Sequence, residues 1–181
     1  MKCQNKTSRL LAINYQLLTI NRGFTLIELL VVFSIIAVLS GVGIVSFVSH
    51  SHSQQVNQTA NNIKLLISQA RFNALSAVKT NQDLSGNTIS CGSESLGGYT
   101  INILGNSQIE LNQLCASVNP SRIKLLVLPN NLTFSGATTC SQIHFSPLSS
   151  TANGAPCNIV LTGYNQTKTI AVDSGGNISV Q

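Results

Sequence analysis

The sequence predicts an α+β fold in which one long N-terminal helix packs on a C-terminal, antiparallel β-sheet head. Three observations predict this fold. Residues 24–48 are dominated by apolar side chains and carry a single charge, Glu28. Apolar residues then recur at every third or fourth position up to about Thr80, which is the period of an amphipathic helix. Beyond residue 81 the chain consists of short strand-like runs separated by Gly, Asn and Ser, which is typical of a sheet with tight turns.

The composition suits an exported protein. The 181 residues are enough for one domain and an anchor. Charged residues make up 8% of the chain, against about 25% in an ordinary soluble protein. The net charge is +5, but four of the cations precede residue 23, and residues 24–181 hold six cations and five acids. The basic balance therefore does not indicate a nucleic-acid-binding surface.

Residues 1–23 are predicted to be a leader that is removed. The segment is basic, and its own apolar stretch, residues 10–20, is too short to span a bilayer. An ordinary secretory signal is cut after its apolar run. Here the only candidate junction, between Gly23 and Phe24, comes before the apolar run, so cutting there leaves that run on the mature protein.

The run from Arg22 to Val32, Arg-Gly-Phe-Thr-Leu-Ile-Glu-Leu-Leu-Val-Val, resembles the prepilin signal of type IV pilins and type II secretion pseudopilins. The resemblance implies a pilin-like fold with the long helix as its spine. It implies that a prepilin peptidase cuts between Gly23 and Phe24 and methylates the amino group of Phe24. It also implies three further partners: other pilin or pseudopilin subunits, an inner-membrane assembly platform and membrane lipid.

Glu28 occupies an energetically unfavourable position. A carboxylate five residues into an apolar helix costs several kcal/mol unless it finds a partner. Cleavage before Phe24 would create a cationic amino group about one helical turn away, and a neighbouring subunit can present the same cation. The resemblance implies that this pairing sets the stagger of subunits entering a filament. The alternative is a glutamate near the membrane surface that reaches the interface.

Residues 24–48 are predicted to be the transmembrane half of the helix. As a helix they span about 37 Å, which exceeds the roughly 30 Å core of a bilayer. Cations precede the run and none follows it before Lys64. The positive-inside rule then predicts a single pass through the cytoplasmic (inner) membrane, with the head exported to the periplasm or cell exterior. Gly41 and Gly43 favour close helix packing over local softness.

Residues 49–80 are predicted to be the amphipathic half of the helix. His50 and His52 suggest a metal site, but residues two apart point to different sides of a helix, so a polar turn is favoured. Lys64, Arg71 and Lys79 are expected on faces in contact with water. The stripe expected to pack on the head comprises Val56, Ala60, Ile63, Ile67, Ala70, Ala74 and Val78, flanked by Leu66 and Leu75.

Residues 81–181 are predicted to be a β-rich head that begins with a loop over residues 81–96. Turns are expected at Gly105-Asn106 and at Ser174 to Asn177. Four C-terminal runs, Ile143-His144-Phe145-Ser146-Pro147, Asn158-Ile159-Val160-Leu161, Lys168-Thr169-Ile170-Ala171-Val172 and Gly176-Asn177-Ile178-Ser179-Val180, resemble the C-terminal half of the GspH/FimT family of minor pseudopilins and minor pilins. The resemblance implies a helix packed on two small antiparallel sheets. The strands are expected at residues 99–104, 108–114, 123–128, 132–135, 142–145, 158–161, 167–172 and 178–180.

The cysteines favour disulfides over metal. Cys3 lies in the leader, and an even set, Cys91, Cys115, Cys140 and Cys157, lies in the exported part. Three pairings of this set are possible. A hairpin turn at Gly105-Asn106 would place Cys115 opposite about Leu96, near Cys91. That placement favours Cys91 with Cys115 and Cys140 with Cys157.

The sequence contains no catalytic constellation and no motif for a cofactor or metal, so the chain is not expected to be an enzyme. The function indicated is a minor pseudopilin of a type II secretion system, processed by prepilin peptidase and assembled into a pseudopilus for protein export. The alternatives are a minor type IV pilin, for pilus assembly, adhesion or DNA uptake, and a membrane-tethered binding module that does not polymerise. Nucleic acid is not expected as a partner, because phosphate contacts need cations and no Lys or Arg follows Lys168.

Overall fold

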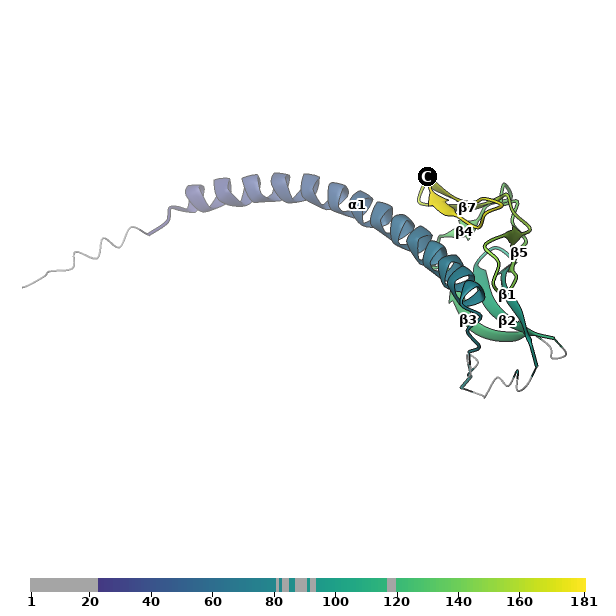
Figure 1. Cartoon of the computed structure of the whole chain (residues 1–181). Helices are drawn as coiled ribbons and strands as arrows, with labels where there is room; N and C mark the ends of the chain where they lie inside the picture. The colour runs from purple at the N-terminus through teal and green to yellow at the C-terminus, as the bar shows by residue number, and fades with distance from the viewer. Residues whose placement is uncertain (1–22, 81, 83–84, 87–90, 92–93, 117–119) are drawn as a thin grey trace, which may run out of the picture. The chain divides into compact units, whose positions relative to one another are not determined.

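The structure is a computed structural model that describes residues 23–80, 82, 85–86, 91, 94–116 and 120–181. Contacts divide the chain into two units, residues 1–43 and residues 44–181. One helix, α1 (Leu26–Leu75), is continuous through the boundary between them, and the strands of the described residues all belong to the second unit (Figure 1). The predicted α+β fold, a long N-terminal helix with a C-terminal antiparallel β-sheet region, is confirmed.

The second unit contains a five-stranded antiparallel sheet with the strand order β3-β2-β1-β5-β6. Its inward face carries apolar side chains at alternate positions, including Tyr99, Ile101, Ile109 and Leu111, which are at most 1% exposed. The strands of this sheet are β1 (Leu96–Leu104), β2 (Gln108–Cys115), β3 (Ser121–Val127), β5 (Gln142–Phe145) and β6 (Ala152–Asn153).

A second antiparallel sheet has the order β4-β7-β8-β9. Its buried residues include Ile159, Leu161 and Ile170, each of which is fully inaccessible to solvent. The strands of this sheet are β4 (Thr133–Phe134), β7 (Cys157–Gly163), β8 (Gln166–Val172) and β9 (Ile178–Val180). The predicted strands are found within three residues of their expected limits, and the two-residue strand β6 is an addition that the sequence did not indicate.

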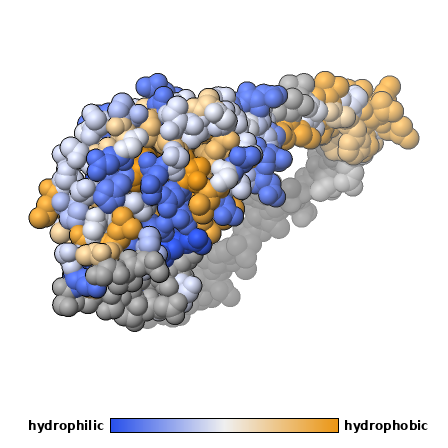
Figure 2. All heavy atoms as spheres, turned by 90° about the vertical axis from the view of Figure 1, so that its right-hand side faces the viewer, coloured by the Kyte–Doolittle hydropathy of each residue, from blue (hydrophilic) through white to orange (hydrophobic). Residues whose placement is uncertain are grey.

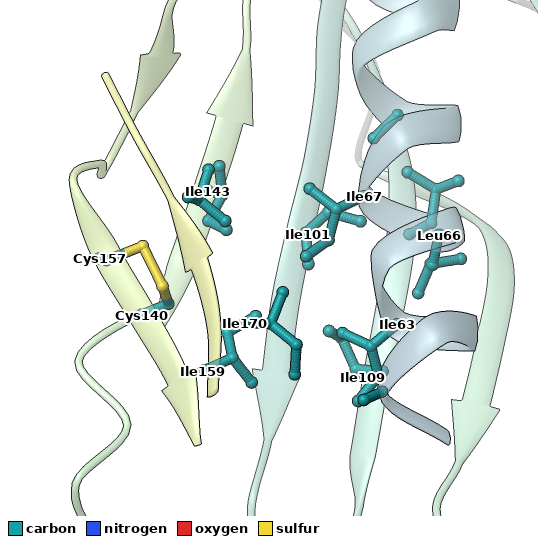
Figure 3. Packing of buried hydrophobic residues seen from close by; sticks show 14 of the residues in the cluster. Ile63, Leu66, Ile67, Ile101, Ile109, Cys140, Ile143, Cys157, Ile159 and Ile170 are labelled. Atoms are coloured by element: carbon teal, nitrogen blue, oxygen red, sulfur yellow. A yellow bond between two sulfur atoms is a disulfide. The ribbon is translucent and has the colours of Figure 1, made fainter. Parts of the chain in front are cut away.

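The C-terminal half of α1 supplies one wall of the core. Its predicted stripe is buried from Val56 to Ala74, together with Leu66, and joins both sheets in a single hydrophobic cluster. Figure 3 shows Ile63 and Ile67 of α1 next to Ile101 and Ile109 of the first sheet. The outside of the head is different: the face in Figure 2 carries mostly hydrophilic and neutral residues with smaller hydrophobic patches.

The expected extension of the helix to Thr80 is wrong, because α1 ends at Leu75. Val78, expected in the buried stripe, is 44% exposed, and Leu75, expected to flank it, is 38% exposed. Buried polar groups of the first sheet bind the chain beyond the helix: the Tyr99 hydroxyl donates to the Val78 carbonyl, and the Thr80 N–H donates to Gln113 Oε1 at 2.8 Å. These bonds satisfy backbone groups that a longer helix would have used itself.

Arg71 does not stay on a water-facing side of the helix as expected. It is half-buried, and its guanidinium donates to the Gly175 carbonyl at 3.0 Å and to Asn177 Oδ1 at 3.3 Å. The turn that it binds connects β8 to β9, as predicted, and is closed by the Gly176 N–H donating to the Asp173 carbonyl at 2.9 Å. Arg71 therefore ties α1 to the last hairpin of the chain.

The turn between β1 and β2 has three residues, Gly105 to Ser107, and not the predicted two, since Leu104 pairs with Gln108. A register shift between Leu96 and Gly98 compensates for the extra residue. As a result Leu96 lies opposite Cys115, which is the pairing expected from the shorter turn. Gly98 fits this irregularity because its φ is +123°, a conformation that side chains rarely adopt.

The end of α1 generates a prediction about stability. The Val78 N–H donates to the Asn73 carbonyl at 3.0 Å, the Ala77 N–H donates to the Ala74 carbonyl at 3.1 Å, and Ala77 has a left-handed φ of 48°. This is a Schellman ending with Ala at the position that glycine usually occupies. Ala77→Gly should raise the free energy of unfolding by about 0.5–1 kcal/mol, because glycine adopts this conformation without strain.

Thermal unfolding of the detergent-solubilised protein measures this effect, and the melting temperature should rise by about 1–4 °C. Ala137→Gly is the matched control, since Ala137 is exposed and is not among the residues with positive φ. It should give no gain, because there glycine only adds freedom to the unfolded chain. A lower melting temperature for Ala77→Gly would contradict the account of the helix end.

Candidate functional site

The predicted processing junction lies outside regular secondary structure. Gly23, Phe24 and Thr25 precede α1, and the Phe24 side chain is 78% exposed. A Cβ added to Gly23 would meet no atom within 4 Å. Within the described part of the chain, Gly23 and Phe24 are therefore both exposed, as a peptidase requires of its substrate.

Thr25 caps the helix directly after the junction. Its hydroxyl accepts a hydrogen bond from the Glu28 N–H at 3.3 Å, and its carbonyl accepts one from the Leu29 N–H at 3.2 Å. Thr25 is thus the N-cap residue and Glu28 is the third residue of the helix. The cap at Thr25 was not predicted, although Thr-x-x-Glu before an apolar run is itself the sequence signature of a capping box.

Glu28 is the acidic residue in the first turn of α1. The positive end of the helix dipole favours a carboxylate at this position. Among the residues that the structure describes, none forms an ion pair with Glu28. Its exposed neighbours Ile27 and Leu29 are apolar. The Glu28 carboxylate therefore stands at the start of an apolar helix without a cation from the described part of its own chain.

The described large apolar side chains from Phe24 to Leu39 are between 47% and 83% exposed, on every side of the helix. By length and composition, α1 contains a stretch that can cross a membrane. Exposed apolar surface of this extent requires lipid or protein around it. The apolar stretch of α1 is therefore suited to a membrane anchor.

The two histidines after this stretch contact different neighbours. His50 Nε2 lies 2.9 Å from Gln54 Nε2 on the same helix. The His52 ring stacks on the Tyr164 ring at the tip of the β7–β8 hairpin, with centroids 4.0 Å apart and planes 12° apart. The described residues contain no group of three or more His, Cys, Asp and Glu side chains that could hold a metal ion.

The cysteines pair within the head. Cys91 is bonded to Cys115, with Cα atoms 5.5 Å apart, and Cys140 is bonded to Cys157, with Cα atoms 5.2 Å apart. These are the two pairs that the sequence favours. The first disulfide fixes the chain before β1 to the end of β2, and the second fixes the chain before β5 to the start of β7. Both therefore stabilise the head rather than form a reactive centre.

Comparison with known families finds one motif. Residues 19–44 match the family model of the prokaryotic N-terminal methylation motif. Searches of curated proteins and of solved structures find no match. The matched residues include the predicted junction, the Thr25 cap, Glu28 and the first part of α1. The chain therefore carries the prepilin signal of type IV pilin-like proteins, and this class of motif belongs to structural subunits.

The Thr25 cap generates a prediction about the start of the helix. Thr25→Ala removes the acceptor of the Glu28 N–H and should cost about 1 kcal/mol of local helix stability. In detergent micelles the Glu28 amide hydrogen should then exchange with solvent roughly fivefold faster, as measured by NMR. Thr25→Ser keeps the hydroxyl and is the control that should preserve slow exchange. Equal exchange rates in both variants would show that Thr25 does not cap the helix.

Proposed function

We propose that this protein is a minor pseudopilin, a pilin-like subunit of a type II secretion machine. A prepilin peptidase cuts it between Gly23 and Phe24 and methylates the new amino group of Phe24. The mature subunit is then assembled into a short filament that serves protein export. The observation that carries the proposal is the methylation motif over residues 19–44, joined to a helix that continues to Leu75.

The order of the segments supports the processing step. The junction precedes the apolar stretch, so cleavage removes the basic leader, residues 1–23, and keeps the membrane anchor, residues 24–48. Residues 49–80 then connect the anchor to the head, residues 81–181. The junction itself is accessible and directly precedes the helix cap. We place the anchor in the cytoplasmic membrane, with its N-terminus in the cytoplasm and the head exported.

The position of Glu28 supports the assembly step. A carboxylate that loses contact with water in an apolar bundle is strongly disfavoured unless it is paired. Cleavage generates a cation at Phe24, four residues away, and the two groups lie at the same end of the helix. When helices of neighbouring subunits pack, the amino group of Phe24 in one subunit neutralises Glu28 in the next. This pairing fixes the axial offset between the two subunits.

A minor type IV pilin is the second candidate, because the methylation motif is common to both kinds of filament subunit. Its processing, anchoring and pairing are identical, and only the machine that receives the subunit differs. Isolation of the subunit with its assembly platform, followed by identification of the platform, separates the two. The non-polymerising alternative gives no role to Glu28, and we do not favour it.

The pairing of Glu28 generates a prediction for assembly. Glu28→Gln keeps the size of the side chain and removes its charge. It should leave cleavage at Gly23–Phe24 intact and reduce incorporation into filaments by at least tenfold, because breaking a buried ion pair costs about 3–5 kcal/mol. Quantitative blotting of sheared filaments, from cells with the cognate machine, measures incorporation.

Glu28→Asp is the matched control at the same position, since it keeps the charge on a side chain one carbon shorter. It should retain much more incorporation than Glu28→Gln. If Glu28→Gln is incorporated as well as the wild-type protein, charge pairing does not govern assembly. If neither the wild type nor any variant enters filaments, the protein is a tethered module and not a subunit.

A further inference from the structure

The outer face of the five-stranded sheet contains a polar pocket at a distance in sequence from the motif. Side chains alternate across a strand, so residues between the buried positions of β1 and β2 face away from the core. The register pairs Thr100 with Asn112 and Asn102 with Glu110. Together with Arg122 of β3 and Gln142 of β5, these residues line a cavity of about 370 Å³, which we call the Glu110 pocket.

Glu110 is the centre of this pocket and is only 6% exposed. Its Oε1 accepts hydrogen bonds from Asn112 Nδ2 at 2.7 Å and from Asn102 Nδ2 at 3.1 Å. Its Oε2 accepts one from Arg122 Nε at 2.6 Å. Burial raises the pKa of Glu110, but these hydrogen bonds and the charge of Arg122 outweigh it and hold the pKa below its usual value. The carboxylate is therefore ionised at neutral pH.

The ionised carboxylate determines how the Asn112 amide is oriented. A carboxylate only accepts hydrogen bonds, so the Nδ2 end of Asn112 must face Glu110. The Oδ1 end then faces away from Glu110. Asn112 is 5% exposed, and its Oδ1 has no hydrogen-bond partner among the described residues. A buried acceptor without a donor is unfavourable, so the floor of the pocket is complementary to a ligand that donates a hydrogen bond.

The rim of the pocket supplies hydrogen-bond donors. Only Nε of Arg122 is engaged by Glu110, and the Arg122 side chain is 49% exposed. Its terminal N–H groups and the exposed amide of Gln142 have no partner among the residues described, so donors surround an acceptor on the floor. The remaining walls, Leu114 and Pro120, are apolar. The negative charge of Glu110 and the positive charge of Arg122 cancel, so the pocket has no net charge.

We propose that the Glu110 pocket binds a neutral carbohydrate, one sugar unit of which donates a hydroxyl to Asn112 Oδ1. Neighbouring hydroxyls on a sugar both donate and accept, so a second oxygen can accept from Arg122 or Gln142. Because the paired charges of Glu110 and Arg122 offset each other, the pocket offers no net electrostatic attraction to a cation or an anion. The cavity lies at the small end of the about 300–1,000 Å³ range of ligand pockets, which suits a single sugar ring.

A peptide is the competing occupant, because its amide groups also donate and accept. Peptides that bind a sheet usually add a strand at its edge. The Glu110 pocket lies on the face of the sheet, over β1 and β2, which are paired on both sides. The inference goes beyond the proposed function and uses none of the residues that govern processing or assembly.

The test is saturation-transfer NMR on the full-length protein in a zwitterionic detergent, because detergents with sugar headgroups would compete. The probes are the methyl glycosides of glucose, galactose, mannose and N-acetylglucosamine. At least one should bind with a Kd on the order of 1 mM, as expected for a small neutral ligand. Asn112→Leu and Gln142→Ala should each weaken binding about tenfold.

Arg122→Gln and Lys124→Gln form the charge-matched pair on β3, since Lys124 contributes to a groove beside α1 and not to the Glu110 pocket. Of these two variants, Arg122→Gln should weaken binding and Lys124→Gln should not. Gln142 is exposed, so Gln142→Ala should have the same melting temperature as the wild type. This variant therefore tests binding separately from folding. Three outcomes would overturn the proposal. They are no saturation transfer from any glycoside at about ten times the expected Kd, equal transfer in all variants, and transfer only from capped neutral peptides.

Discussion

The rest of this molecule depends on one constraint: a single helix must bury apolar surface on all sides in its first half and on only one side in its second half. From Phe24 to Leu39 the described apolar side chains are exposed all round α1, whereas from Val56 to Ala74 they form one buried stripe. A surface that is apolar on all sides needs lipid or other helices, and a one-sided stripe needs a single sheet-bearing core. The change of pattern within one helix therefore explains how the head continues directly into an apolar segment suited to a membrane, without a separate linker.

Three features needed for processing and assembly lie within a few residues at the start of the helix. The Gly23–Phe24 bond is exposed, Thr25 satisfies the N–H of Glu28, and Glu28 carries a charge that its described surroundings do not neutralise. In the proposed pathway, cleavage creates the missing cation only after the leader has been removed. Assembly then follows processing for an electrostatic reason, because the uncut chain has no free amino group at Phe24 to offer to a neighbouring subunit.

Much of the fold could be predicted from the sequence, because periodicity and turn residues report local structure. The register of Leu96 with Cys115 was also predicted, but from a two-residue turn, and a longer turn with a register shift gives the same result. The helix end, the position of Arg71 and the Glu110 pocket were not predictable in this way. Each involves at least one hydrogen bond between separate elements, such as Arg71 with Gly175 or Tyr99 with Val78, and no local pattern records such a bond.

The central claim is that the mature protein begins at a methylated Phe24, and intact-mass analysis with N-terminal sequencing tests it most directly. The protein should be isolated from membranes of cells with and without an active prepilin peptidase. The account predicts an N-methylated Phe24 terminus when the peptidase is active, and a chain that retains its leader when it is not. An uncut chain in both cases, or a cut beyond Val48, would contradict the account, because the anchor and Glu28 would then have no role in a filament.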